Sequence, residues 1–95
     1  MSVAEIEATL VAQTGTEIIS TDDLQHSYAQ ERAGRFWLFT GPRYVAFPAL
    51  VCRTVLRRNG EVGIQSEIIC ADSREDCDQF VRDNQASIDR LLARQ

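Results

Sequence analysis

The chain has 95 residues and a formal net charge of −4, with 44% hydrophobic and 25% charged residues. This length fits one small domain with a thin core, and the composition is that of a folded globular chain and excludes a disordered one. The longest apolar run, residues 44–52, is far shorter than the roughly 20 residues needed to cross a bilayer, and the first ten residues lack the basic start of an export signal. We therefore expect a single α+β domain over residues 1–95, cytoplasmic and without a membrane partner.

The N-terminal segment has the signature of a capped helix. Ser2 and Glu5 stand at the two positions of a capping box. One helical stripe then carries three apolar residues: Val3, Ile6 and Leu10. These features predict a helix over about residues 3–13.

The next segment, residues 16–33, has two interpretations. Its first part contains Ile18 and Ile19 and is short enough to be either a strand or a linker. The remainder can form a helix, since Leu24 and Tyr28 are four residues apart, or an edge strand through Tyr28. The sequence alone leaves helix and strand both open here.

β-Favouring residues dominate after residue 34. Residues 36–40 and 44–47 flank the turn Gly41-Pro42-Arg43, which predicts a hairpin. Pro48 lacks an N–H group for a sheet, so we expect an edge or a bend at that position.

Asn59-Gly60 is the strongest turn signal in the chain, because a two-residue type I′ turn needs positive φ at both positions. It predicts a hairpin between residues 50–58 and 61–71, and we favour it over a helix ending at Gly60. With this turn, Arg58 lies opposite Glu61 and the side chains sort into two faces. One face carries Val51, Val55, Val62, Ile64 and Ile68. The other carries Leu50, Cys52, Leu56 and Ile69.

The C-terminal segment predicts the longest helix, over about residues 73–93. Asp72 to Glu75 form a second capping signature. An apolar stripe at helical spacing follows: Cys77, Phe80, Val81, Ile88, Leu91 and Leu92. The expected fold is an antiparallel meander of about four strands with the N-terminal and C-terminal helices packed on it, both on the face of Val51.

Cysteine and histidine usage argues against disulfides and metals. Cys52, Cys70 and Cys77 make an odd number without a CxxC pair, and His26 is the single histidine. A structural zinc site needs four such ligands in close pairs. In the hairpin register Cys52 and Cys70 point to opposite faces and cannot bridge. We therefore expect free thiols, no intrachain disulfide, no metal and no cofactor.

Arginines and aromatic residues are interleaved in residues 35–58, as they are on platforms that bind single-stranded nucleic acid. The binding candidates are Arg35, Trp37, Arg43, Tyr44, Arg53 and Arg57. The ordinary interpretation is that these aromatics pack inside the fold, and the net negative charge also opposes phosphate binding.

No catalytic constellation is recognisable. His26 has Asp22 nearby, which is more typical of a solvated surface pair than of a general base. Cys77 fits a small apolar residue of the helix stripe better than a reactive thiol. No nucleotide-binding, hydrolase or metalloprotease motif is present, so we name no catalytic residues.

The leading hypothesis is a small protein-binding module, an adaptor, chaperone or inhibitor, that forms a homodimer through its second sheet face or a sheet edge. The candidate interface residues are Leu50, Cys52, Leu56 and Ile69, because an uncovered apolar patch favours association. The first alternative is a single-stranded nucleic-acid binder that uses residues 35–58. The second is a small dimeric enzyme without a recognisable motif.

Overall fold

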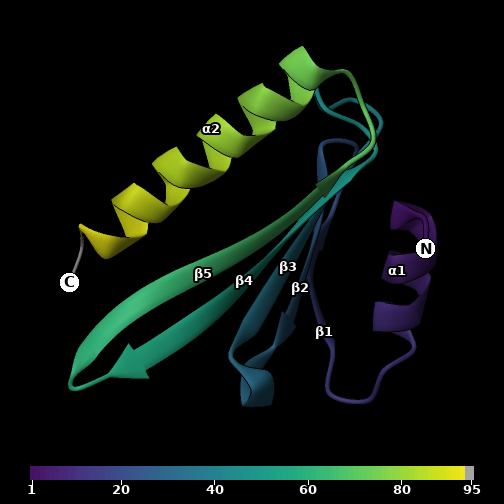
Figure 1. Cartoon of the computed structure of the whole chain (residues 1–95). Helices are drawn as coiled ribbons and strands as arrows, with labels where there is room; N and C mark the ends of the chain where they lie inside the picture. The colour runs from purple at the N-terminus through teal and green to yellow at the C-terminus, as the bar shows by residue number, and fades with distance from the viewer. Residues whose placement is uncertain (94–95) are drawn as a thin grey trace.

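The computed structural model describes residues 1–93 and contains a five-stranded antiparallel sheet with one helix on each face (Figure 1). The strands lie side by side in chain order, so the sheet is a meander. The elements are α1 (Val3–Val11), β1 (Glu17–Thr21), β2 (Gln25–Gln30), the 3-10 turn η1 (Glu31–Ala33), β3 (Arg35–Thr40), β4 (Ala49–Arg58), β5 (Glu61–Cys70) and α2 (Arg74–Leu92). The expected α+β class and meander are confirmed, with five strands in place of about four.

Helix α1 begins at the expected capping box. The Ser2 hydroxyl accepts the N–H of Glu5, and the Glu5 carboxylate accepts the N–H of Ser2, both at 3.1 Å. The apolar stripe of the helix then covers one face of the sheet, which we call the α1 face. Its core cluster consists of Val3, Leu10, Tyr28, Phe39 and Leu50.

Residues 16–33 form a strand hairpin and a single 3-10 turn, so the helix alternative is wrong. Tyr28 does lie in a strand, but β2 pairs with both β1 and β3 and is not the expected edge strand. The turn between β1 and β2 is held by Asp22, whose carboxylate accepts the N–H groups of Leu24 and Gln25 at 2.8 Å each. Tyr28 then lies in β2, buried beneath α1.

The hairpin expected across residues 36–47 is wrong. β3 pairs with β4, and residues 41–48 form a loop between them. This loop packs on the β1–β2 turn, because the N–H groups of Gly41 and Arg43 donate to the carbonyls of Leu24 and Asp23 at 2.8 and 3.0 Å. Residue 41 must be glycine, since a Cβ there would collide with the Asp23 backbone.

The β4–β5 hairpin has the expected turn and register. Asn59 and Gly60 have φ of 53° and 82°, as a type I′ turn requires. Arg58 pairs with Glu61, Val55 with Ile64, and Val51 with Ile68. The two sets of side chains therefore occupy the two faces assigned from the sequence.

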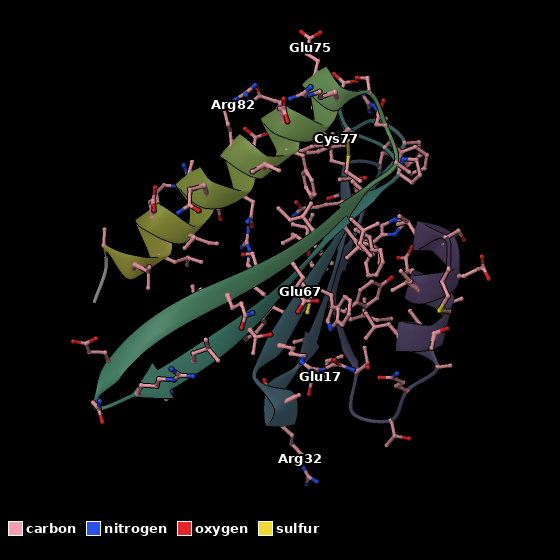
Figure 2. The ribbon with its side chains drawn as sticks, viewed as in Figure 1. Glu17, Arg32, Glu67, Glu75, Cys77 and Arg82 are labelled. Atoms are coloured by element: carbon pink, nitrogen blue, oxygen red, sulfur yellow. A yellow bond between two sulfur atoms is a disulfide. The ribbon has the colours of Figure 1, made fainter. Side chains whose placement is uncertain are left out.

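Helix α2 is confirmed, but it lies on the face opposite α1, so the expectation that both helices share one face is wrong (Figure 1). We call this side of the sheet the α2 face. Phe80 is 3% exposed there and packs with Ala46, Ala49 and Val51. Figure 2 shows Glu75 and Arg82 on the side of α2 that points away from the sheet.

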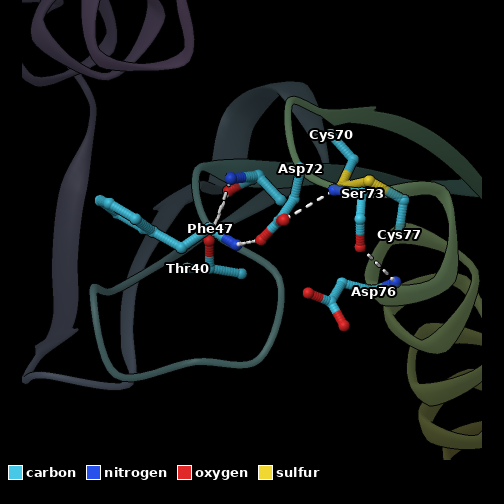
Figure 3. Close-up of a disulfide and its surroundings, with 8 residues drawn as sticks. Thr40, Phe47, Cys70, Asp72, Ser73, Asp76 and Cys77 are labelled. Atoms are coloured by element: carbon cyan, nitrogen blue, oxygen red, sulfur yellow. Dashed lines mark hydrogen bonds between the residues drawn. A yellow bond between two sulfur atoms is a disulfide. The ribbon is translucent and has the colours of Figure 1, made fainter.

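A disulfide joins Cys70 at the end of β5 to Cys77 in the first part of α2, with the Cα atoms 5.9 Å apart (Figure 3). The expectation of no intrachain disulfide is therefore wrong. Only the Cys52–Cys70 pair was considered from the sequence, and Cys52 is indeed a buried free thiol. The turn that precedes α2 brings the other pair together: Asp72 accepts the N–H groups of Phe47 and Ser73, and the Ser73 hydroxyl accepts the N–H of Asp76.

Candidate functional site

An open apolar groove of about 550 Å³ lies on the α2 face, between the sheet and the C-terminal end of α2. Its apolar lining includes Phe36, Leu38, Val55, Val62, Ile64 and Leu91. Phe36 is 41% exposed and Leu91 42% exposed, so solvent reaches the groove along its length. The helix leaves the sheet residues of this lining partly exposed, although they belong to the same sheet face as the buried Val51.

The groove lies beside the second half of α2, because the tight apolar packing of the helix on the sheet is concentrated in its first half. The disulfide and Phe80 fix the first half of the helix near the end of β5. From there α2 runs alongside the β4–β5 hairpin toward the hairpin turn (Figure 1). Residues 55–58 and 61–64 also extend beyond the last β3–β4 pair, Arg35 with Thr54. Residues 55–58 therefore have no β3 residue beside them, and Val55, Val62 and Ile64 remain only partly buried.

A polar bridge ties α2 to the sheet beside the groove. Asn84 is 6% exposed; its amide oxygen accepts from Arg53 Nε at 2.8 Å, and its amide nitrogen donates to Ser66 Oγ at 3.2 Å. Partial burial lowers the pKa of the Arg53 guanidinium. Arg53 nevertheless remains a cation, because arginine is protonated at any ordinary pH.

Two of the candidate binding residues line the groove on β4. Arg53 and Arg57 stand on alternate positions of the same face as Val55, and within residues 1–93 neither forms a salt bridge. Arg35 is on the α1 face and Arg43 is exposed in the loop after β3, so the structure does not bring the four arginines together. The groove thus combines an apolar floor with two cations on one wall.

The two aromatic candidates are engaged within the fold. Trp37 stacks on Phe39 with ring centroids 6.2 Å apart, and its indole N–H donates to Gln30 at 2.9 Å. The Tyr44 hydroxyl donates to Asp83 at 2.8 Å and its ring meets Phe80 edge to face. Burial and this hydrogen bond raise the pKa of Tyr44 to about 12. The two rings lie on different sides of the sheet and present no shared stacking platform.

The four candidate interface residues do not form one patch. Leu50 is 2% and Cys52 8% exposed, and Leu50 belongs to the core cluster under α1. Leu56 and Ile69 are 38% and 46% exposed. They are separated along the hairpin, since Ile69 pairs with Leu50 and Leu56 with Gly63. Helix α1 therefore covers much of the face that the sequence left open.

A second polar cluster, which the sequence did not reveal, joins α1 to β2. The Glu7 carboxylate contacts His26 Nδ1 at 2.8 Å and accepts the Tyr28 hydroxyl at 2.6 Å. Burial, followed by the bond to Glu7, raises the pKa of Tyr28 to about 12. The partner of His26 is thus Glu7 and not Asp22, whose carboxylate is used in the β1–β2 turn. The cluster pins α1 to the sheet.

Within residues 1–93 no group of three or more His, Cys, Asp and Glu side chains is placed to hold a metal ion. No helix in this part of the chain is long and apolar enough to cross a membrane.

The sequence predicted the two strands that form the floor of the groove, but it did not predict the groove itself. Val55, Val62 and Ile64 were assigned to one face and expected to lie under a helix. The available signal was Asn84, a polar residue in the middle of the α2 stripe, which marks the point where apolar packing on the sheet gives way to a polar bridge. No family model, curated protein or solved structure matches the chain, so the geometry alone supports a function.

Proposed function

We propose that the protein is a small protein-binding module, and that its groove takes an apolar segment of a partner protein that carries a carboxylate. The observation that carries this proposal is the open groove lined by Phe36, Val55, Ile64 and Leu91. Small soluble proteins rarely leave contiguous apolar surface uncovered, and such surface marks interaction sites. Each large aliphatic side chain buried there contributes about 1.5 to 3 kcal/mol.

The two arginines beside the groove indicate the charge of the segment that it binds. Arg53 and Arg57 have no carboxylate partner among residues 1–93, although the chain as a whole is acidic. A guanidinium beside apolar surface favours a carboxylate, with which it forms two parallel hydrogen bonds. Arg53 is also preorganised by Asn84, which reduces the side-chain entropy lost on binding.

The two alternative functions have less support from the same contacts. Nucleic-acid stacking needs free aromatic faces, and Trp37 and Tyr44 use theirs inside the fold. Catalysis needs a group that moves a proton or attacks a substrate. The groove lining contains no carboxylate, imidazole or thiol, and the polar side chains on this face are those of Ser27, Arg53 and Arg57.

The test uses fluorescein-labelled synthetic peptides of about twelve residues with leucine and valine at alternate positions. One peptide carries two glutamates, and its control carries two glutamines in their place. We expect the acidic peptide to bind with the higher affinity in fluorescence anisotropy. Its advantage should shrink as salt is raised, because the arginines are partly screened by ions.

Neighbouring residues of β4 offer a matched pair of variants. Val55 lines the groove, whereas Leu56 points to the opposite face and is 38% exposed. We expect Val55→Asp to abolish peptide binding and Leu56→Asp to preserve it, with both variants shown by circular dichroism to be folded. Equal binding by the two variants, or equal affinity for the acidic and the amide peptide, would contradict the proposal.

A further inference from the structure

The two edges of the sheet differ in how well they are protected against pairing with another strand. β1 has five residues and its register is broken between Ile18 and Ser20. β5 has ten residues in continuous register with β4, and it contains neither proline nor lysine. Natural proteins protect edge strands by shortness, bulges, proline or charge. β1 has two of these devices, whereas β5 has only two glutamates.

The turn determines which backbone groups of β5 are free. In a two-residue hairpin the first pair, Arg58 with Glu61, is hydrogen bonded, and bonded and non-bonded pairs then alternate. Odd-numbered residues of β5 therefore bond to β4, which agrees with the bond from Ala71 N–H to the Pro48 carbonyl at 2.9 Å. The even-numbered residues direct N–H and C=O outward: Val62, Ile64, Ser66 and Ile68.

This outward edge has no strand beside it within residues 1–93. β5 pairs with β4 alone, and Figure 1 shows it as the outermost strand. No residue of β5 is buried, whereas the first four residues of β4 are all buried. Four residues with free, aligned donors and acceptors form a template for an added strand.

We propose that a second copy of this chain occupies the edge, with the two β5 strands antiparallel about a two-fold axis at Gln65. Outward residues must face outward residues, so the pairs about this axis are Ile64 with Ser66 of the other copy and Val62 with Ile68 of the other copy. Both chains then exchange backbone hydrogen bonds, and the sheet continues across the interface. This pairing is independent of what the groove binds.

Charge selects this register over its neighbours. An axis at Ile64 would place Glu61 directly opposite Glu67 of the other copy, and like charges facing each other are destabilising. An axis at Ser66 would bring the two Glu67 side chains to a diagonal separation of about 7 to 8 Å. With the axis at Gln65, Glu67 faces Gly63 and the two Glu67 residues lie about 13 Å apart along the strands. Figure 2 shows Glu67 on the side of β5 that faces α1, away from the groove.

The first experiment is symmetric cysteine cross-linking of the full chain. Gln65 faces its own copy in a non-hydrogen-bonded pair with Cα atoms about 4.5 Å apart, within disulfide range. We expect Gln65→Cys to form a covalent dimer on mild oxidation, seen on a non-reducing gel. The matched control, Glu67→Cys, has the same native cysteines and should stay uncrosslinked, because its symmetry mate is too distant.

The second experiment places charges at the axis, where the exposed Gln65 side chain tolerates change in the monomer. Gln65→Glu and Gln65→Lys should each weaken self-association by about fivefold or more in sedimentation velocity. An equal mixture of the two variants should restore dimers. A native protein that is monomeric at all concentrations, cross-linking by Glu67→Cys in place of Gln65→Cys, or failure of the mixture to restore dimers would overturn the proposal.

Discussion

The Cys70–Cys77 disulfide should contribute a large share of the stability of this fold. It closes a loop of eight residues, 70–77, that joins β5 to α2. In the chain-entropy description a loop of this length stabilises the folded state by about 2.5 kcal/mol. A domain of this size has a total unfolding free energy of about 5 to 14 kcal/mol, so loss of the bond is a substantial perturbation.

The assay is urea unfolding followed by the fluorescence of Trp37, the single tryptophan, which lies under α1 and away from the disulfide. We expect Cys77→Ser to lower the urea midpoint by about 1 to 2 M. Reductant should shift the native protein by a similar amount. It should not shift a Cys70→Ser/Cys77→Ser variant, which retains Cys52 and controls for effects of the reductant elsewhere.

Thiol titration in denaturant without reductant supplies the independent check. One reactive thiol, that of Cys52, should be found before reduction and three after it. Three thiols before reduction would refute the pairing. An unchanged urea midpoint after confirmed reduction would refute the argument that the bond holds α2 against β5.

Three further predictions follow from single contacts. Gly41→Ala should cost about 1 to 3 kcal/mol, measured by urea unfolding against Gly63→Ala as control, because the added methyl meets the Asp23 backbone while position 63 has open space. Asn84→Ala should cost about 1 to 3 kcal/mol, with exposed Gln85→Ala near neutral, because Arg53 loses its partner. Burial raises the pKa of both tyrosines to about 12, so the phenolate absorbance at 295 nm should stay flat near pH 10. Their contribution to the free energy of unfolding should be complete below about pH 10 and should decrease as the pH rises toward 12. A tyrosine that titrates near pH 10 in the folded protein would contradict the burial of Tyr28 or Tyr44.

Turn chemistry explains which parts of the fold were predictable. Asn59-Gly60 admits one turn type, and that turn sets the whole β4–β5 register because side chains alternate strictly along each strand. The capping residues Ser2 and Ser73 similarly defined where both helices begin. In these segments the local signal and the tertiary structure agree.

The segment around Asp22 was ambiguous for a physical reason. A carboxylate that accepts the N–H groups two and three residues later satisfies a helix N-terminus and an Asx turn equally well. The spacing of Leu24 and Tyr28 fitted a helix. Tyr28 instead lies in β2, where α1 covers its side chain, and only the tertiary structure shows this contact.

The site and the disulfide depended on relations that periodicity does not encode. The apolar stripe of α2 predicts contact with a sheet, but it does not show how much of the helix packs closely on that sheet. Both Val55 and Leu91 were therefore expected to be covered. The turn at Asp72 and Ser73 brings Cys70 and Cys77 together. The spacing of the two cysteines in the sequence does not indicate this contact. The apolar character of both sheet faces suggested a dimer interface, whereas α1 accounts for most of the second face.

The two proposed surfaces use different atoms of the same strand. Val62 and Ile64 present their side chains to the groove and their backbone groups to the free edge. A two-fold axis at Gln65 stands perpendicular to the continued sheet, so both α2 faces would lie on the same side, with Val62 of one copy beside Ile68 of the other. The two grooves would then open on one surface and could engage two segments of one partner, which raises the effective concentration of the second segment. Gln65→Glu separates these contributions: the variant should bind a single acidic peptide with native affinity and lose the advantage that the native protein shows toward two such peptides joined by a flexible linker.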